Sequence, residues 1–445
     1  MTRDRAAEVS QALAWGFLAA PAWTRRGLRA AGRRTLGCRP AFLAAVVERV
    51  LAAYRRPPVD RPAELARYLL ADEDLVEAVA LAAARGPALR VRRIPARPGR
   101  MGPRRWPVPP VDGLPAFARL LEVPLEQLPW LGDLKGLQRR APDGPLHLYR
   151  YRWVARPGAV PRLLESPTPL LRHVLRRLLD SVLAPVPVHP AAHGFVPGRS
   201  ALTHARAHVG ADLLVCLDLR HFFATVSGAR VAGIFRTLGY PEAVAAAMTG
   251  LVTHRTPVAV LSRMPAGGDS SGRQLLKARL RTAHLPQGVP TSPALANLAC
   301  FGLDVRLAGY AQAAGARYGR YADDLTFSGP AELAAPRLVR AVAAIVAEEG
   351  FALNPAKTRV QRHTARQQVT GLVVNTGLGV PREVEDRLRA VLHDAARRGP
   401  QVANRAAVPD FRAHLEGRVS WVEAVNPVRG ARLRRQLDAV SWSQR

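Results

Sequence analysis

The stretch GARYGRYADDLTFSGP, residues 315–330, constrains the fold of this chain more than any other feature. Its pattern predicts two strands joined by a tight turn, with Asp323 and Asp324 side by side at the tip. Aspartate tolerates the unusual backbone angles of a hairpin turn, so the pair alone indicates only a well-formed turn. The two carboxylates nevertheless repel each other, which raises the question of what compensates them.

A third acid ends another strand-like run. LLVCLDL, residues 213–219, predicts a buried strand that reaches Asp218 near its end. A lone Asp there is usually a cap or turn residue. If this strand neighbours the hairpin, the three carboxylates meet and raise one another's pKa, a penalty that a divalent cation removes. We therefore expect Asp218, Asp323 and Asp324 to hold two Mg²⁺ ions, about 4 Å apart, that activate a 3′-hydroxyl and stabilise a leaving pyrophosphate.

The net charge agrees with a polyanionic partner. The chain has 65 Lys and Arg against 34 Asp and Glu, a formal charge of +31. Such an excess repels itself unless something anionic lies against it, and nucleic acid is the usual partner, with an acidic membrane surface as the alternative. A GC-rich genome explains Arg in place of Lys, but it does not explain Arg in place of Glu.

Neither the apolar runs nor the cysteines indicate a membrane or an oxidising compartment. No apolar run approaches the roughly 18 residues that a membrane-spanning helix needs, so we expect no membrane partner. Cys38, Cys216 and Cys300 lie far apart and fit no disulfide or metal spacing. We therefore predict a reducing compartment, the cytoplasm.

A chain of 445 residues predicts two or three domains. Residues 1–85 are rich in Ala, Leu and Arg with helical periodicity, and predict a helical amino-terminal extension. Residues 86–113 are dense in Pro, Gly and Arg and predict a basic linker. Order returns from 114, the motifs begin near 146, and the tail from 376 predicts basic helices.

Four motifs carry a resemblance to reverse transcriptases. YADD with its preceding strand resembles their catalytic hairpin, and LDLRHFFATVS resembles their first metal-binding motif. LPQGVPTSPALANL resembles the motif that contacts template and nucleotide, and GFALNPAKTRV the motif after the catalytic hairpin. AAHGFVPGRSALTHARAHVG and RQQVTGLVVN narrow the resemblance to bacterial retron reverse transcriptases. The resemblance covers residues 146–445.

The resemblance implies an α+β right-hand polymerase with fingers and an antiparallel-sheet palm in 114–375 and a helical thumb in 376–445. It implies that the three aspartates are the catalytic, metal-binding triad and that Phe223 excludes a ribose 2′-hydroxyl. It also implies nucleotide-binding roles, with Arg162 on the triphosphate and Lys357 near the pyrophosphate, for Arg162, Phe223, Gln287, Gly288 and Lys357.

The narrower resemblance implies contacts to RNA by His208, Val369, Thr370 and Gly371. Otherwise we expect His193, His208 and His284 to be hydrogen-bonded structural residues. The implied function is synthesis of single-stranded DNA, called msDNA, on a cognate structured non-coding RNA. It is primed from a guanosine 2′-hydroxyl and forms part of anti-phage defence. The implied partners are that RNA, the RNA–DNA hybrid, deoxynucleoside triphosphates and a protein effector of the defence system.

Two alternatives stay open. One is another bacterial reverse transcriptase, of the group II intron or abortive-infection type, although no cysteine follows Cys300 to form a Cys/His-rich nuclease domain. The other is a non-catalytic RNA-binding protein with a polymerase fold. The presence of all three acids counts against the second alternative.

Overall fold

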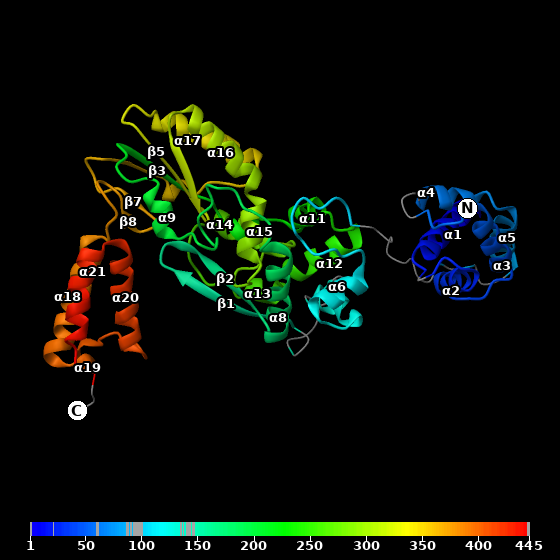
Figure 1. Ribbon diagram of the computed structural model, residues 1–445, viewed down its shortest axis with the longest axis horizontal. Helices are drawn as coiled ribbons and strands as arrows, with labels where there is room; N and C mark the ends of the chain where they lie inside the picture. Colours follow the sequence, from blue (N-terminus) through cyan, green and yellow to red (C-terminus); the bar gives the residue numbers. More distant parts are fainter. Residues whose placement is uncertain are drawn as a thin grey trace. The chain divides into compact units, whose positions relative to one another are not determined.

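The computed structural model describes residues 2–20, 22–58, 62–85, 89, 91, 101–133, 136, 138, 144 and 147–442 (Figure 1). The chain divides into two compact units. The first consists of Met1–Leu148, Thr168–Pro185 and Ala229–Thr253, and the second consists of Tyr149–Pro167, Val186–Gly228 and His254–Arg445. The predicted fingers and palm, 114–375, therefore contribute segments to both units.

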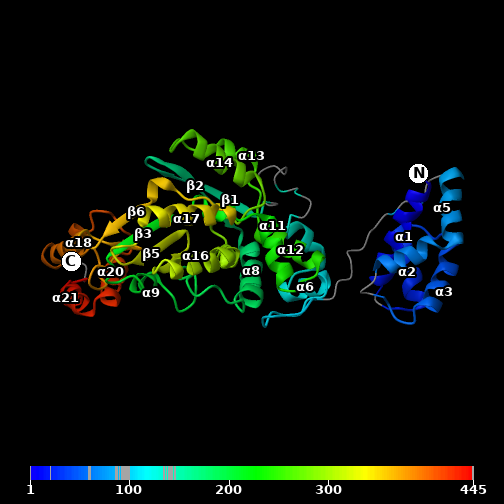
Figure 2. The same ribbon diagram turned by 90° about the horizontal axis from the view of Figure 1, so that it is seen from above.

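An antiparallel four-stranded sheet forms the centre of the second unit. Its order is β4-β5-β3-β6, and every neighbouring pair is antiparallel. Helices α16 and α17 lie beside it (Figures 1 and 2), which makes this an α+β layer as the sequence predicts. Every residue of β3 is buried, because its apolar run supplies both faces of a central strand. The elements are β3 (Leu213–Asp218), β4 (Arg317–Tyr321), β5 (Asp324–Gly329), β6 (Arg359–Arg362), α16 (Phe301–Ala313) and α17 (Ala335–Glu348).

A separate antiparallel hairpin, β1–β2, carries further residues of the site. Side chains of β2 alternate between buried and less buried, the pattern of a strand with one face packed. Its inner face joins an apolar cluster with α13 and α14 that includes Leu163, Leu261 and Leu276. The bounds are β1 (Tyr149–Arg156), β2 (Ala159–Pro167), α13 (Val258–Ser262), α14 (Ser270–Arg281), α9 (Ala201–Arg206), α10 (Phe222–Thr225), α15 (Ser292–Ala299) and η3 (Pro355–Lys357).

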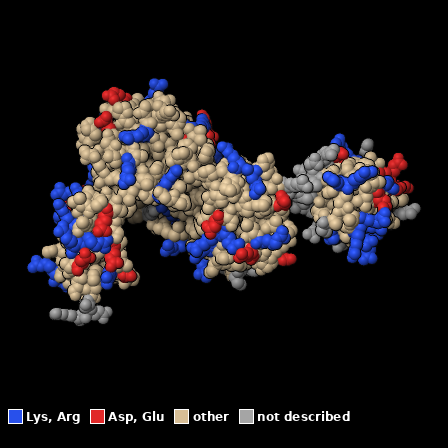
Figure 3. Space-filling model, in the orientation of Figure 1, with Lys and Arg blue, Asp and Glu red and all other residues tan. Residues whose placement is uncertain are grey.

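The carboxyl-terminal helices pack around leucines and valines. Their apolar cluster includes Leu388, Leu392, Leu415 and Leu433 and continues through the short β7–β8 hairpin to Leu214 of β3. In Figure 3, Lys and Arg side chains gather over the region of these helices, with Asp and Glu between them. The elements are β7 (Gln368–Val369), β8 (Leu372–Val373), α18 (Arg382–Arg398), α19 (Pro400–Ala403), α20 (Phe411–Val425) and α21 (Pro427–Asp438).

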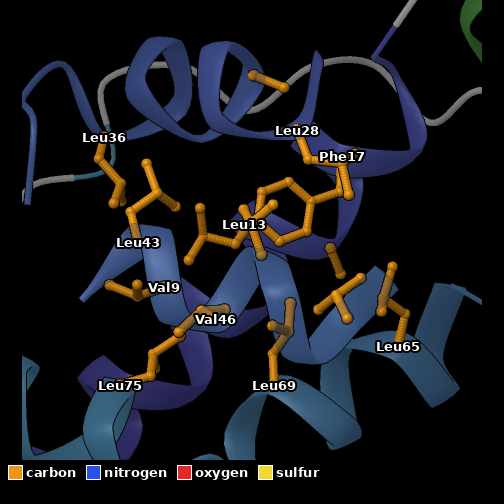
Figure 4. Close-up of a cluster of buried hydrophobic side chains, with 14 of the residues drawn as sticks. Val9, Leu13, Phe17, Leu28, Leu36, Leu43, Val46, Leu65, Leu69 and Leu75 are labelled. Atoms are coloured by element: carbon orange, nitrogen blue, oxygen red, sulfur yellow. The ribbon is translucent and has the colours of Figure 1, made fainter. Parts of the chain in front are cut away.

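The five amino-terminal helices, in the first unit, enclose a core of their own. Figure 4 shows Val9, Leu13 and Phe17 meeting side chains from the other helices, among them Leu28, Val46, Leu65 and Leu75. All the fully buried members of this core lie between residues 6 and 79. The helices are α1 (Thr2–Leu18), α2 (Arg25–Leu36), α3 (Leu43–Ala53), α4 (Pro62–Leu70) and α5 (Glu73–Arg85).

Most of the first half of the predicted linker, 86–100, lies outside the described residues, and only its second half, 101–113, can be compared with the structure. The described part of 86–113 is not a free tether from 101 onward, because Val108 and Val111 are buried and Gly102 N donates to Gly239 O over 2.7 Å. Tyr240 Oη also donates to Pro109 O over 3.2 Å. Val108 and Val111 each follow a proline directly and supply this apolar contact, which the Pro, Gly and Arg content of the segment does not indicate. The remaining elements are α6 (Leu114–Leu121), η1 (Leu125–Gln127), α7 (Leu128–Leu131), α8 (Pro169–Leu178), η2 (Leu179–Leu183), α11 (Gly228–Thr237) and α12 (Glu242–Val252).

Among the described residues, no helix combines the length and the apolarity that a membrane crossing requires.

Candidate active site

Strand pairing brings the three acids to one end of the central sheet. Asp324 pairs with Tyr321 across the hairpin and with Asp218 across the β3–β5 ladder. Asp323 lies in the turn, and its carbonyl accepts a hydrogen bond from Leu219 N over 2.9 Å. The strands that carry the acids are thus direct neighbours, the condition under which the sequence predicted that the carboxylates meet.

The electrostatics reflect this crowding. Loss of solvent, together with the charge of Asp218, raises the pKa of Asp323, and the positive charges of Lys357 and Arg162 act in the opposite direction. Loss of solvent, followed by the charges of Asp323 and Asp218, raises the pKa of Asp324 to about 6. Additional positive charge at this end of the sheet therefore favours the ionised form of both carboxyl groups.

Lys357 supplies one such charge. Its Nζ donates to Asp218 Oδ2 over 2.6 Å, and the lysine side chain remains 48% exposed while that of Asp218 is 6% exposed. Asn354 adds a weaker contact, with Nδ2 at 3.4 Å from Asp218 Oδ1, and its backbone N donates to Asp218 O over 2.8 Å. These contacts fix the segment 354–357 beside Asp218, the last residue of β3.

Asp218 and Asp323, but not Asp324, line a cavity of about 500 Å³, a volume within the range of small-molecule ligand sites. Phe222 and Phe223 both line it, but Phe223 is only partly buried, whereas Phe222 is 4% exposed and packs near Phe351. Of the two adjacent phenylalanines, Phe223 is therefore the more accessible to a ligand. The cavity also brings together the predicted residues Arg162, Asp218, Gln287, Asp323 and Lys357.

A buried Glu–His pair, which the sequence analysis did not predict, supports this cavity. Glu165 Oε2 lies 2.9 Å from His284 Nε2, and Thr256 Oγ1 donates to Glu165 Oε1 over 2.7 Å. His284 Nδ1 lies 2.8 Å from Thr282 O, so both ring nitrogens face acceptors and the imidazolium satisfies both. Burial alone would lower the pKa of His284, but the charge and hydrogen bond of Glu165 raise it. Burial would likewise raise the pKa of Glu165, and the charge of His284 lowers it.

This pair anchors the loop with the predicted nucleotide-binding residues. Glu165 N donates to Gln287 O over 2.8 Å, and this hydrogen bond connects β2 to residues 285–288. Gly288 has φ 117°, and a Cβ there would lie 3.3 Å from Glu165 O, so glycine is the residue that fits both the angle and the space. His284 itself is a hydrogen-bonded structural residue, as the sequence analysis expects.

A second unpredicted network lies behind the β4–β5 hairpin. The Arg320 side chain is fully buried, and its Nε and Nη2 donate to Asp304 Oδ1 and Oδ2 over 2.8 and 2.6 Å. Its Nη1 donates to Asn297 Oδ1 and to Ala322 O, both over 3.0 Å. Ala322 has φ 56°, an unfavourable angle for a residue with a Cβ, so Arg320 holds the turn that presents Asp323. The strand reads RYGRY and carries a second, exposed arginine at Arg317, so the local sequence does not single out Arg320 as the buried one.

The oxygen donors of the acids fit Mg²⁺. In the described part of the chain no three His, Cys, Asp or Glu side chains already surround a single point as a metal cage. Mg²⁺ usually binds through one or two carboxylates and completes its shell with water and substrate phosphates. Asp218 and Asp323 at the cavity match that sparse donor set, and their crowding provides the charge that a cation would neutralise.

The predicted RNA-binding residues divide into two groups. Thr370 and Gly371 form the tip of the β7–β8 hairpin, with φ values of 48° and 83°, as in a two-residue type I′ turn. Gly371 is exposed, but Val369 is buried in the apolar cluster. His208 is fully buried and its Nδ1 lies 2.8 Å from Ser328 Oγ, so this side chain offers no surface for the direct RNA contact that the resemblance implied.

Comparisons with known proteins find reverse transcriptases similar to this chain. Residues 161–374 match the family described as reverse transcriptase (RNA-dependent DNA polymerase). The retron Mx65 reverse transcriptase of Myxococcus xanthus is 44% identical over 296 residues, 65% of this chain and 64% of that protein. The retron Mx162 reverse transcriptase of the same organism is 36% identical over 343 residues, 74% and 67% of the two chains.

Further comparisons are more distant. The retron Ec86 reverse transcriptase of Escherichia coli is 32% identical over 221 residues, 49% of this chain and 59% of that protein. The solved foamy viral protease-reverse transcriptase in complex with RNA/DNA hybrid aligns with a TM-score of 0.31 and 16% identity, covering 66% of this chain and 34% of that chain. That score is too low to carry an argument. The match to the Mx65 protein spans just under two thirds of its length.

Proposed function

We propose, from the premise that this chain belongs to the bacterial retron-type reverse transcriptases, that it is an RNA-directed DNA polymerase. The observation that carries the proposal is the meeting of Asp218, Asp323 and Asp324 at the end of the palm sheet. Asp218 and Asp323 line a cavity that also holds Arg162 and Lys357, and Asp324 pairs with Asp218 beside it. Carboxylates for metal ions beside cationic side chains for phosphates are the groups that nucleotidyl transfer requires.

Each residue then has a distinct task. Asp218, Asp323 and Asp324 would hold the metal ions, which when bound activate the 3′-hydroxyl and neutralise the leaving pyrophosphate. Arg162 binds the triphosphate, and Lys357 carries a proton at Nζ that it can donate to the pyrophosphate. Phe223 occupies the space that a 2′-hydroxyl would need, so deoxynucleotides are preferred. Gln287 and Gly288, held by Glu165, contact the incoming nucleotide and the template.

The retron relatives support a narrower form of the proposal. We infer that the template and primer are parts of one structured non-coding RNA and that synthesis starts from a guanosine 2′-hydroxyl and yields msDNA. We further infer that Mg²⁺ is the metal and that the system serves anti-phage defence together with an effector protein. The β7–β8 tip, where Gly371 is exposed and Thr370 half-buried, and the basic carboxyl-terminal helices are the surfaces we assign to the RNA and the RNA–DNA hybrid.

The test is primer extension by purified protein on an RNA template with deoxynucleotides and Mg²⁺. Asp323→Asn preserves the size of the side chain and removes a metal ligand, so extension should fall below a few per cent of the wild-type rate. RNA affinity should stay close to wild type because the basic surfaces are unchanged. Extension by Asp323→Asn near the wild-type level would refute the triad, and a wild-type protein that binds RNA without extending a primer would favour a non-catalytic role.

A further inference from the structure

Phe195 is a strained and exposed aromatic residue inside the candidate active site. Its backbone has φ 62°, a conformation that bulky residues rarely adopt. Its side chain is 50% exposed, although a large apolar ring normally gains free energy by burial. The ring lines the cavity and lies 6.2 Å from that of Phe223, centroid to centroid. Folding alone accounts for neither the strained angle nor the exposed ring.

The chain around Phe195 is held in place from the catalytic hairpin. Arg320 N donates to Ala191 O, and His193 N donates to Arg320 O, both over 2.8 Å, so this segment runs along β4. Gly194 lies directly against the turn, because a Cβ there would be 2.5 Å from Ala322 N. Asn297 Nδ2 also donates to Gly194 O over 2.9 Å. These contacts fix the backbone immediately before Phe195 relative to the acids.

The chain after Phe195 is fixed as well. Arg199 N closes a turn on Val196 O over 3.0 Å, and its Nη1 donates to Pro190 O and Ala192 O over 2.8 and 2.6 Å. A residue in an unfavourable backbone conformation persists only where its surroundings determine it, and such residues concentrate at functional sites. The arrangement presents one face of an aromatic ring to the cavity at a defined position relative to Asp323.

We propose that Phe195 is a stacking platform for a nucleobase bound in this cavity. The inference rests on the proposed polymerase function and extends it by naming a residue that binds substrate. Every nucleobase has a flat π-face, and an exposed aromatic ring binds it without regard to sequence, as a polymerase requires. Phe223 lies at the ribose, and Phe195, at 6.2 Å from it, binds the neighbouring base. The base belongs either to the incoming nucleotide or to the template.

The experiment compares Phe195→Ala with Phe195→Tyr, which restores a ring, and with Phe301→Ala as a matched control. Phe301 is 44% exposed, lies on α16 and does not line the cavity. We first measure the melting temperature of each variant. The KM for deoxynucleotides, kcat and the Kd for an RNA template–DNA primer are then measured at a temperature at which every variant is folded. Wild-type extension is measured first, so that a failure of the polymerase proposal is recognised separately.

Loss of stacking should weaken binding by roughly 5- to 150-fold in Phe195→Ala, with kcat and the melting temperature close to wild type. A higher KM identifies the base of the incoming nucleotide, and a higher Kd for template–primer identifies a template base. Phe195→Tyr and Phe301→Ala should both behave as wild type. Unchanged KM and Kd in Phe195→Ala would overturn the inference. So would an equal loss of stability and activity in both Phe195 variants, because that pattern indicates a purely structural role.

Discussion

Removing one partner of the buried Arg320–Asp304 pair should destabilise the protein far more than removing a surface ion pair. Asp304→Ala leaves the Arg320 guanidinium fully buried with two of its donors unpaired, and it also removes the acceptor of Tyr318 Oη, which lies 2.8 Å from Asp304 Oδ1. An uncompensated buried charge of this kind costs about 3–5 kcal/mol in the free energy of unfolding. The hydrogen bonds counted singly, at about 1.5–3 kcal/mol each for charged groups, give the same order.

The assay is urea unfolding of Asp304→Ala beside Arg306→Met as the surface control. Arg306 pairs with Glu348 and Glu349 at 39% side-chain exposure, and exposed pairs contribute about 0–1 kcal/mol. If Asp304→Ala lowers the free energy of unfolding by less than about 1 kcal/mol, the reasoning is refuted, because an unpaired buried charge should cost more than that. The double variant Arg320→Met with Asp304→Leu should regain most of the stability, because neither charge is then buried alone.

That double variant also separates stability from positioning. It still lacks the guanidinium that donates to Ala322 O, so the turn that presents Asp323 is no longer held. Primer extension should therefore remain low although the protein is folded. Recovery of both stability and activity would show that Arg320 does not position the turn.

Three further changes test the site and the amino-terminal helices. Phe223→Ala should admit ribonucleotides in primer extension; if the variant still rejects them, the gate lies elsewhere and Phe222, which also lines the cavity, becomes the first candidate. Pairing raises the pKa of His284 above 6.5 and lowers that of Glu165 below 4.5, so the pair stabilises the fold fully between these values. The stabilisation is lost as pH rises through the folded pKa of His284 or falls through that of Glu165. Glu165→Gln should thus abolish the loss of stability as pH rises above 6.5, because the folded pKa of His284 is then no longer raised, and an unchanged profile would exclude the pair as its source. Deleting residues 1–85 should weaken RNA binding and leave kcat unchanged. The slope of log affinity against log salt should fall by about 0.7 for each single-strand phosphate that the protein no longer neutralises. Equal slopes for the two proteins would instead favour docking of a protein partner.

Motif order and residue type were sufficient to predict that Asp218, Asp323 and Asp324 lie at one end of the same sheet. Asp218 ends a run that is apolar enough to be a central strand, and Asp323 and Asp324 lie between two strand-like segments, so chemistry and periodicity point to one acidic site. Phe223 was assigned to the ligand from motif position, and it is the more exposed of two phenylalanines that both line the cavity. These predictions depend on short segments, where local pattern and the final structure agree.

Only the tertiary structure decided which distant residues support that centre. Glu165 and His284 are 119 residues apart and Asn297 and Gly194 are 103 apart, and no local pattern indicates that either pair meets. The same holds for the burial of His208 against Ser328, and for the strained backbone of Phe195. The physical reason is that burial, pairing and backbone strain arise from chain segments brought together by packing, whereas the identity of a reactive group is already present in its side chain.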